Sequence, residues 1–229
     1  MKYKVSAIIT AAGSGRRFNK EKKTAIPKQF VLLKGKPVIL YSLVVFQKCK
    51  QVDEIIVSAD KKYFNLLHNI AVKNGITKLT CIVEGGETRF ESVRNAFMQA
   101  VNTKGRLVMV HDAARPNIDL PLIERLISER RNYDGIVPGI KIPETVKRAQ
   151  KGIVTETLNR EDLYTVQTPQ LFKYDALLSA YLKSSNKNDY TDEASLAEYA
   201  GYKIRITEGK KGNIKITTAE DIKLLKLLM

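Results

Sequence analysis

The most informative stretch of the chain reads Val5-Ser6-Ala7-Ile8-Ile9-Thr10-Ala11-Ala12-Gly13-Ser14-Gly15-Arg16-Arg17-Phe18. Its first six residues form a short apolar run that predicts a buried strand. The small residues and glycines that follow let backbone N–H groups approach a phosphate closely. The two adjacent arginines add the charge that a polyphosphate requires. We therefore predict a phosphate-binding turn after the strand, although a plain strand–loop connection would explain the glycines alone.

Two well-known phosphate-binding motifs are excluded by the residues themselves. A dinucleotide-binding fingerprint requires a third glycine where Phe18 stands, and a P-loop requires a Gly-Lys-Ser/Thr run that the chain lacks. A further cation follows at Lys28, in the run Pro27-Lys28-Gln29. Cations beside a glycine turn suit a polyphosphate whose negative charge spreads during a reaction. The pattern favours phosphoryl chemistry at a site of another kind.

Apolar runs of four to six residues alternate with segments of helical periodicity through the first half of the chain. The expected strands are Val5–Thr10, Glu54–Ser58, Leu79–Val83, Leu107–His111 and Asp134–Pro138, and the expected helices are Val38–Gln47, Tyr63–Lys73, Arg89–Val101 and Leu120–Arg131. This alternation predicts an α/β fold with a Rossmann-like, mostly parallel, doubly wound sheet. Ligands of such sheets bind beyond the carboxyl ends of the strands. The segments to inspect are Thr10–Phe18, Glu84–Arg89, His111–Pro116 and Pro138–Lys141.

The alternation is interrupted between residues 142 and 160. Glu144–Ala149 and Ile153–Leu158 are expected to pair as a hairpin across Gln150-Lys151-Gly152. Because an isolated hairpin is marginal in water, we expect this β-arm to lean on a second subunit. Later elements are expected as helices at Tyr174–Lys183, Asp192–Tyr199 and Thr218–Leu228 and as a strand at Lys203–Thr207. We interpret residues 1–229 as one domain that includes an arm at about 142–160.

The composition excludes several classes of protein. Hydrophobic residues make up 44% and charged residues 28% of the 229 residues, so the chain is not disordered as a whole. Two cysteines, Cys49 and Cys81, cannot form a disulfide framework and suit a reducing compartment. The sequence contains neither a signal-peptide pattern nor an apolar run of about 18 residues. We expect a cytoplasmic protein without a membrane span.

The net charge of +15 indicates an anionic partner. A nucleic-acid-binding protein is the alternative from a different functional class. The aromatic residues do not interleave with basic ones as in a base-stacking motif, and no nucleic-acid-binding module is spelled out. Residues 16–28, which include the end of the glycine turn, hold six basic residues against one acidic residue, whereas the remaining excess is scattered, so a phosphorylated small molecule is favoured and a nucleic acid is not expected.

Several motifs together resemble one enzyme family. They are the glycine turn with Pro27-Lys28-Gln29, Glu84-Gly85-Gly86-Glu87-Thr88-Arg89, His111-Asp112-Ala113-Ala114-Arg115-Pro116, Thr168-Pro169-Gln170, Thr191-Asp192-Glu193-Ala194-Ser195 and Asn213-Ile214-Lys215. In this order they resemble the 2-C-methyl-D-erythritol 4-phosphate cytidylyltransferases, which are nucleotidyltransferases of the sugar-nucleotide pyrophosphorylase-like group. The resemblance covers essentially the whole chain. Each motif alone would be weak.

The resemblance implies a homodimeric enzyme that joins CTP to a polyol phosphate, with help from Mg²⁺ or another divalent cation, and releases pyrophosphate. A phosphate monoester dianion is already a nucleophile, so the reaction needs positioning and charge neutralisation rather than a basic side chain. The sequence agrees, because no set of nucleophile, base and orienting residue is recognisable. The resemblance also implies the β-arm of one subunit reaching over the active site of the other.

The resemblance assigns roles to particular residues. Arg17, Lys28 and Lys215 would hold the triphosphate and stabilise charge at the α-phosphoryl group, and Asp112 would bind the metal. The implied CTP-binding residues are Ala11, Ala12, Gly13, Gly15, Gly86, Glu87, Ser92 and Ala113, and the implied polyol-phosphate-binding residues are Arg115, Thr145, Arg160, Thr168 and Thr191.

Simpler interpretations stand beside some of these roles. Asp112 can instead cap a helical turn, and Lys215 can be an exposed lysine. His111 is expected to pack as a structural residue at its strand end. Arg115 can pair with Asp112 or reach the polyol phosphate. Asp192 and Glu193 fit either helix N-terminal acids or ligands of substrate hydroxyls, and the sequence does not separate the two.

The sequence departs from the family pattern in two places. Residues 18–26 form a longer, lysine-rich connection, which suggests a lid over the triphosphate, and Gly209–Gly212 offers no second metal-binding carboxylate. The alternative substrate is ribitol 5-phosphate, used by a related family whose members typically have valine at the position of Ala114. The choice rests on Ala114, Thr145 and Arg160, and methylerythritol phosphate is favoured. Since the sequence stops soon after its last helix, we expect no fused cyclodiphosphate synthase.

Overall fold

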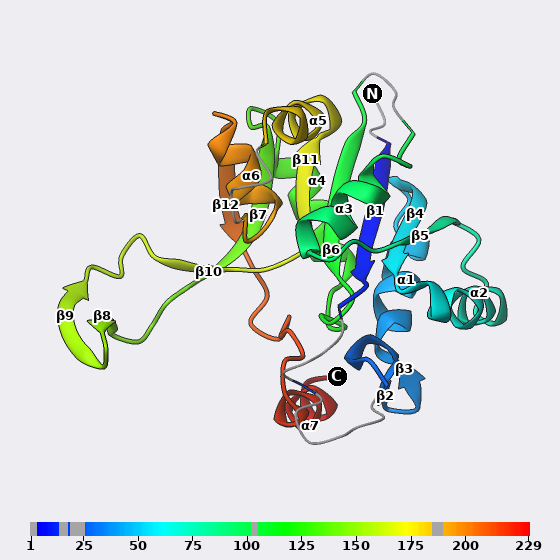
Figure 1. Cartoon of the computed structure of the whole chain (residues 1–229), viewed down its shortest axis with the longest axis horizontal. Helices are drawn as coiled ribbons and strands as arrows, with labels where there is room; N and C mark the ends of the chain where they lie inside the picture. Colours follow the sequence, from blue (N-terminus) through cyan, green and yellow to red (C-terminus); the bar gives the residue numbers. More distant parts are fainter. Residues whose placement is uncertain (1–3, 14–17, 19–25, 102–104, 185–189) are drawn as a thin grey trace.

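The computed structural model describes residues 4–13, 18, 26–101, 105–184 and 190–229. Within them, a central sheet carries helices on both faces, and a hairpin extends away from the body (Figure 1). This architecture confirms the predicted α/β, Rossmann-like class.

The described part of the sheet has eight strands, and most run parallel. The order is β10-β7-β11-β6-β1-β4-β5, and β12, which lies off this path, also pairs with β7. Five strands match predicted ones and run as β1 Val5–Ala11, β4 Val52–Ala59, β5 Leu79–Glu84, β6 Leu107–Asp112 and β7 Gly135–Lys141. β12, Ile204–Glu208, pairs parallel with β7 and agrees with the strand expected at Lys203–Thr207.

Two strands of the sheet were not predicted. β11, Gln170–Lys173, lies between β6 and β7 and is antiparallel to both, and β10, Tyr164–Val166, pairs antiparallel with β7. Neither has the apolar run by which a strand is recognised in a sequence. β11 is therefore defined by its backbone hydrogen bonds to β6 and β7. This pairing brings the segment before β11, which includes Thr168, to the end of β6.

Successive side chains of β1 point to opposite faces of the sheet and so contribute to two apolar cores. Ala7 and Ile9 belong to one core cluster, and Ile8, pointing to the opposite face, belongs to another. The first core is covered by α1 Val38–Lys48, α2 Phe64–Lys73 and α4 Leu120–Glu129, and the second by α3 Arg89–Phe97, α5 Tyr174–Lys183 and α6 Glu193–Tyr199. The helix expected at Arg89–Val101 ends earlier, at Phe97. The helix expected at Tyr63–Lys73 begins at Phe64 and is preceded by a 3₁₀ turn, Lys61–Tyr63.

A third apolar cluster joins the two ends of the chain. α7, Ala219–Leu228, packs Leu225 against Leu33 and Val38, near a small hairpin of β2 Leu32–Leu33 and β3 Lys36–Pro37. Thr218 caps α7, as predicted, in a capping box with Asp221. Ile216, just before α7, is fully buried in the same cluster. This packing holds the C-terminal segment against the loop that follows β1.

The hairpin is present where it was expected, with slightly shifted bounds. β8, Val146–Gln150, pairs antiparallel with β9, Ile153–Leu158. Lys151 and Gly152 both have positive φ, the geometry of a tight hairpin turn. Ile153 is 72% and Val154 57% exposed. The arm, which extends away from the body of its own chain (Figure 1), thus carries exposed apolar side chains.

The longest helix among the described residues, α1, has 11 residues. Among the described residues, no helix is long and apolar enough to cross a bilayer.

Candidate active site

The parallel strands end together at one edge of the sheet, here called the carboxyl edge. The loop after β1 begins there with Ala12 and Gly13. Gln29, from the 3₁₀ turn Lys28–Phe30, donates its side-chain amide to the carbonyl oxygens of Ala11 and Gly13. The run Pro27-Lys28-Gln29 is thereby fixed against the turn, which places Lys28 beside it. Residues 14–17, with the predicted Gly15 and Arg17, lie outside the described residues.

The turn after β5 packs directly on the loop after β1. A side chain at Gly85 would meet the Cβ of Ala12 at 2.2 Å, and one at Gly86 would meet the Cβ of Glu91 at the same distance. Glycine is required at both positions for this close approach. The hydroxyl oxygen of Ser92 accepts from the Gly86 N–H at 3.1 Å, which fixes the turn to α3. The two loops therefore form adjoining walls of one site.

A pocket of about 540 Å³ opens between these loops. Eight of the predicted site residues line it: Ala12, Gly13, Lys28, Gly86, Glu87, Ser92, Asp112 and Lys215. Thr10, Phe18, Gln29, Thr88, Arg89, Ala114 and Thr217 complete the lining. Its volume is in the range of small-molecule sites.

Asp112, the last residue of β6, carries the central carboxylate of the pocket. Its Oδ2 lies 2.7 Å from Lys215 Nζ and 3.8 Å from Arg115 Nε, and its Oδ1 lies 3.4 Å from Arg89 Nε. Burial alone would raise the pKa of this carboxyl, but the three cations hold the pKa of Asp112 well below its usual range. Asp112 is therefore ionised throughout the physiological pH range.

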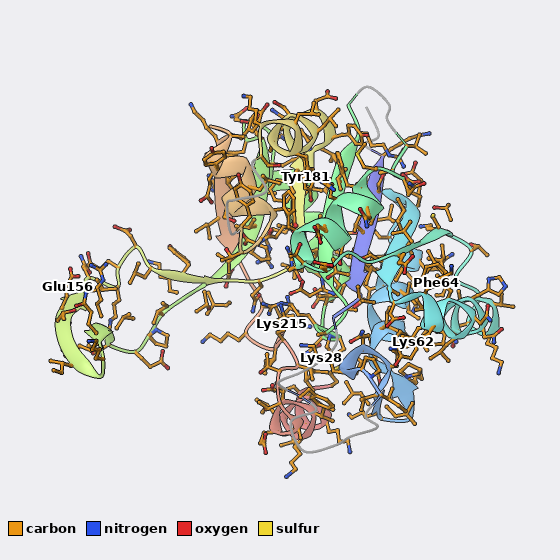
Figure 2. The ribbon with its side chains drawn as sticks, viewed as in Figure 1. Lys28, Lys62, Phe64, Glu156, Tyr181 and Lys215 are labelled. Atoms are coloured by element: carbon orange, nitrogen blue, oxygen red, sulfur yellow. The ribbon has the colours of Figure 1, made fainter. Side chains whose placement is uncertain are left out.

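The two lysines reach the pocket from opposite ends of the chain. Lys215 comes from the segment before α7, whose Ile216 N–H donates to Ala114 O at 2.8 Å. Lys28 Nζ donates to Ile216 O at 2.6 Å. Figure 2 shows both side chains in the space between the sheet and α7. The motif Asn213-Ile214-Lys215 is thus brought to the glycine turn by the packing of the C-terminal helix.

A buried polar network, formed by Thr168, His111 and Ser42, holds the backbone of Asp112 in place. The Asp112 N–H donates to Thr168 Oγ1 at 3.1 Å, and His111 Nδ1 lies 3.0 Å from the same hydroxyl. His111 is fully buried, and its Nε2 lies 3.0 Å from Ser42 Oγ. Burial lowers the pKa of His111 to about 3, so the ring is neutral. His111 is thus a packed structural residue, and the Thr168 hydroxyl is engaged inside this network.

The remaining predicted residues do not line the pocket. Ala11 and Ala113 are buried next to lining residues, and Arg115 donates to Asn213 O at 2.8 Å while facing Asp112. Thr191 is exposed before α6. Thr145 and Arg160 are exposed at the two ends of the arm, where Arg160 Nη1 donates to Pro143 O. Within one chain, the structure does not bring Thr145 and Arg160 to the pocket.

Sequence reasoning missed one prominent contact. Arg89 lines the pocket, and its guanidinium makes two hydrogen bonds of 2.9 Å to the carboxylate of Glu193. Arg89 and Glu193 both stand in motifs quoted above, each at the first position of a capped helix. Helices were expected at Arg89–Val101 and Asp192–Tyr199, but nothing in the sequence predicted that the two side chains would meet.

The charges of the pocket are compatible with a magnesium ion. Among the described residues, no group of three or more His, Cys, Asp or Glu side chains could hold a metal by itself. Magnesium commonly uses one or two carboxylates together with substrate phosphates and water. Asp112, low in pKa and facing the pocket, fits the part of a single protein carboxylate.

Comparison with known proteins identifies the family. The family model described as IspD, 2-C-methyl-D-erythritol 4-phosphate cytidylyltransferase, matches residues 5–229. The cytidylyltransferase of that name from Clostridium novyi is 40% identical over 219 residues, covering 94% of this chain and 92% of that protein.

Two crystal structures also resemble the chain, each with a TM-score of 0.82. The Francisella tularensis 2-C-methyl-D-erythritol 4-phosphate cytidylyltransferase is 33% identical and covers 99% of this chain and 100% of its own. The Anaerococcus prevotii 4-diphosphocytidyl-2C-methyl-D-erythritol synthase is 29% identical and covers 100% and 99%.

These likenesses extend over the whole fold, and the residues matched by the family model span every segment that lines the pocket. The parallel sheet, the two glycine loops at its carboxyl edge and the cations around Asp112 occur in a chain whose sequence matches the family model almost from end to end. The chain therefore belongs to the 2-C-methyl-D-erythritol 4-phosphate cytidylyltransferase family.

Proposed function

We propose that the chain transfers CMP from CTP to 2-C-methyl-D-erythritol 4-phosphate, giving 4-diphosphocytidyl-2-C-methyl-D-erythritol and pyrophosphate for isoprenoid biosynthesis. The observation that carries the proposal is the pocket itself. It places two glycine loops, one ionised carboxylate and Lys28 and Lys215 around a space of about 540 Å³, in a chain whose family is established. This is an arrangement for a nucleoside triphosphate that reacts at a phosphoryl group.

The reaction needs no covalent enzyme intermediate. A phosphate oxygen of the polyol phosphate attacks the α-phosphorus of CTP, forming a new P–O bond. The bond between the α-phosphorus and the bridging oxygen breaks in line with it, and the electron pair leaves with pyrophosphate. Negative charge grows on the phosphoryl oxygens during this step. The enzyme accelerates the reaction by holding both phosphates in place and by neutralising that charge.

Lys28 and Lys215 supply positive charge from two sides of the pocket. Lys28 is held beside the glycine turn by the 3₁₀ turn that begins with it, and Lys215 is held by the packing before α7. Lys215 pairs with Asp112 in this structure. We propose that Lys215 moves to the phosphates when the substrates enter. Arg17 joins them as a predicted cation of the triphosphate site.

Asp112 is the residue that would hold Mg²⁺. When bound there, Mg²⁺ would neutralise part of the phosphoryl charge. Thr10 lies beside the carboxylate, with its hydroxyl 3.4 Å from Asp112 Oδ1. Thr168, through its contact with the Asp112 N–H, keeps the carboxylate at the end of β6. The protein thus offers one well-supported carboxylate, and the substrate phosphates supply the other anionic ligands.

The cytidine half of CTP is assigned to the walls of the pocket. The backbone of Ala12 and Gly13, which line the pocket, is assigned to the base and phosphates, and Ala11, Gly15 and Ala113 stay predicted residues of the same subsite. Gly86, Glu87 and Ser92 form the opposite wall, and the contact between Gly85 and Ala12 closes the space between them. A closed wall of this kind disfavours a purine, because the larger base needs room that the two loops occupy.

The arm is assigned to a homodimer. Thr145 and Arg160 belong to the arm at about 142–160 and do not line the pocket of their own chain, so their predicted contact with the polyol phosphate requires a second subunit. The exposed Ile153 and Val154 supply apolar surface for that contact. A cavity of about 720 Å³ lies at the base of the arm and is available to receive the arm of the second subunit. Its lining includes Ile140, Pro143, Tyr164 and Ile206. We accordingly propose one domain with a dimerising arm, acting in the cytoplasm without a nucleic-acid partner.

Pyrophosphate release tests the function. The purified chain is given CTP and Mg²⁺ with 2-C-methyl-D-erythritol 4-phosphate or ribitol 5-phosphate, and ATP replaces CTP as the purine control. Release that requires CTP and prefers the methylerythritol phosphate supports the proposal. Preference for ribitol 5-phosphate would overturn the assigned acceptor, and release with neither polyol would overturn the function.

A further inference from the structure

Arg89 and Glu193 have no part in the proposed function so far, yet they are paired in the pocket wall. Arg89 Nη1 and Nη2 donate to Glu193 Oε1 and Oε2, both at 2.9 Å. The Glu193 side chain is only 2% exposed, whereas the Arg89 side chain is 28% exposed and reaches the pocket. A buried glutamate therefore holds an arginine that faces the substrate site.

The geometry of the guanidinium makes this pair directional. Because the group is planar, two parallel hydrogen bonds to one carboxylate fix the plane and leave Nε pointing to one side. In this structure, Arg89 Nε points to Asp112, with 3.4 Å to Oδ1. Glu193 thus determines where Arg89 is placed, and Arg89 in turn faces one oxygen of the proposed metal ligand.

The two oxygens of Asp112 have different partners. Oδ1 lies beside Arg89 Nε and Thr10 Oγ1, each at 3.4 Å, and Oδ2 lies 2.7 Å from Lys215 Nζ. In the proposed reaction, Lys215 leaves Asp112 for the phosphates. The contact with Arg89 does not depend on that movement, since Arg89 is anchored to Glu193 and not to the substrate.

We propose that Arg89, locked by Glu193, is a positioning residue that keeps the Asp112 carboxylate oriented for the metal while Lys215 moves to the substrate. This inference deepens the proposed function and rests on it. A second consequence follows from the same lock. With its guanidinium held on Glu193, Arg89 does not turn into the pocket to bind the triphosphate in an unproductive way.

The simplest alternative is that the pair only stabilises the fold. The chain offers a matched control for it, because Arg106 and Glu54 form another buried ion pair at 2.6 Å, with side chains 4% and 7% exposed. This pair lies at the opposite, amino-terminal edge of the same sheet. Glu193→Gln and Glu54→Gln make the same chemical change in both pairs, so a merely structural role predicts the same consequences for both.

The test compares these two variants in steady-state kinetics and binding. For Glu193→Gln we expect kcat to fall about 10- to 100-fold, with the KM for CTP changed much less, because a misplaced group costs rate more than binding. We expect the Mg²⁺ concentration for half-maximal activity to rise about tenfold, as for other residues that orient a metal ligand. Glu54→Gln is expected to lower the melting temperature but to keep both kinetic values within about twofold of the wild type.

Two further measurements keep the test decisive. Glu193→Asp preserves the buried charge but retracts it by one methylene, so it is expected to fold and still to lose kcat, even if Glu193→Gln does not fold. Calorimetric titration of CTP with and without Mg²⁺ gives a readout that does not need turnover, and Glu193→Asp is expected to lose the gain in affinity that Mg²⁺ gives the wild type.

The inference and the proposed function fail in different ways. Wild-type kcat, KM and Mg²⁺ dependence in a folded Glu193→Asp variant would overturn the positioning role and leave the function intact. A wild-type protein that releases no pyrophosphate would overturn the function. In that case, the calorimetric comparison alone decides whether Glu193 supports metal-dependent CTP binding.

Discussion

The two edges of the central sheet differ in the balance between their positive and negative side chains. At the amino-terminal edge, Arg106 is enclosed by partners: Nη2 lies 2.6 Å from Glu54, Nη1 lies 3.0 Å from Asp53, and Nε donates to Ser6 at 2.6 Å. At the carboxyl edge, two carboxylates, Asp112 and Glu193, face three cations, Arg89, Arg115 and Lys215. The first cluster has no surplus of positive charge, and the second does.

The difference separates a structural charge cluster from a functional one. Burying ions is costly, so a cluster with only a structural role pairs every charge. A surplus of cations around a pocket is costly too, and it persists where an anion is to be bound. The depressed pKa of Asp112 is a direct consequence, because the surrounding cations outweigh the effect of its burial. Substitutions at the carboxyl edge should therefore change catalysis, and those at the amino-terminal edge should change stability.

The largest effect is expected from Lys28→Ala. This change removes a cation from the phosphate side of the pocket, and we expect kcat to fall about 1,000-fold, as for the loss of a preorganised charge-stabilising group. Pyrophosphate release measures the rate. Lys62→Ala is the matched control, since it removes an exposed lysine paired with Asp60 at 2.8 Å. A Lys28→Ala rate within tenfold of the wild type would show that the long lysine-rich connection supplies the charge instead.

Asp112→Asn is expected to have the next largest effect. The amide keeps the shape of the side chain but loses the charge that Mg²⁺ requires, so we expect activity at a fixed Mg²⁺ concentration to fall about 100-fold. The Mg²⁺ titration should shift to higher concentration. An unchanged titration midpoint would remove Asp112 as the metal ligand and would leave the surplus of cations as the main feature of this edge.

Arg160→Ala tests whether the cationic edge is completed by a second subunit. We expect the KM for the polyol phosphate to rise about tenfold with little change in kcat, because a hydrogen bond to a charged group is lost. Arg148→Ala, which removes another exposed arm arginine, is the control. Mixed dimers of Lys28→Ala and Arg160→Ala chains should recover activity, because one site then has both residues. Mixed dimers without recovered activity would contradict an arm that acts across the dimer.

The fold was largely predictable because its core strands carry their own signal. β1, β4 and β6 each contain a run of apolar residues, and the position of the loops after them follows from the parallel arrangement. β11 could not be found in this way. It is only four residues long, and it forms because β6 and β7 supply hydrogen-bonding partners on both sides. Tertiary pairing, rather than local preference, specifies such a strand.

The site was predictable where its residues lie next to one another in the sequence. The glycine turn, Asp112 and Lys215 belong to recognisable motifs, and the pocket brings them together. The pair of Arg89 and Glu193 was not predictable, because its members are 104 residues apart and the sequence indicates only that a helix begins near each of them. A cap determines where a helix begins, but the partner of the next side chain depends on how two helices pack on the sheet.

The smallest effect is expected at the amino-terminal edge, from Asp134→Asn. Asp134 accepts from Lys173 Nζ at 2.9 Å and from the Lys203 N–H at 3.1 Å. Burial alone would raise the pKa of Asp134, but these partners lower it below its usual value. Because the folded state binds this proton less readily than the unfolded chain, the ionised carboxylate stabilises the fold at neutral pH. That contribution is lost as the pH falls below about 4.

Chemical unfolding at several pH values checks this prediction. Since Asp134 is partly exposed, we expect Asp134→Asn to lower the free energy of unfolding at pH 7 by only about 1 kcal/mol, with the difference shrinking toward pH 3. Turnover at pH 7 should remain within about twofold of the wild type, because the substitution changes a paired charge far from the pocket. A loss of turnover without a loss of stability would contradict the division of roles between the two edges. It would mean that Asp134, a paired charge at the amino-terminal edge, takes part in catalysis.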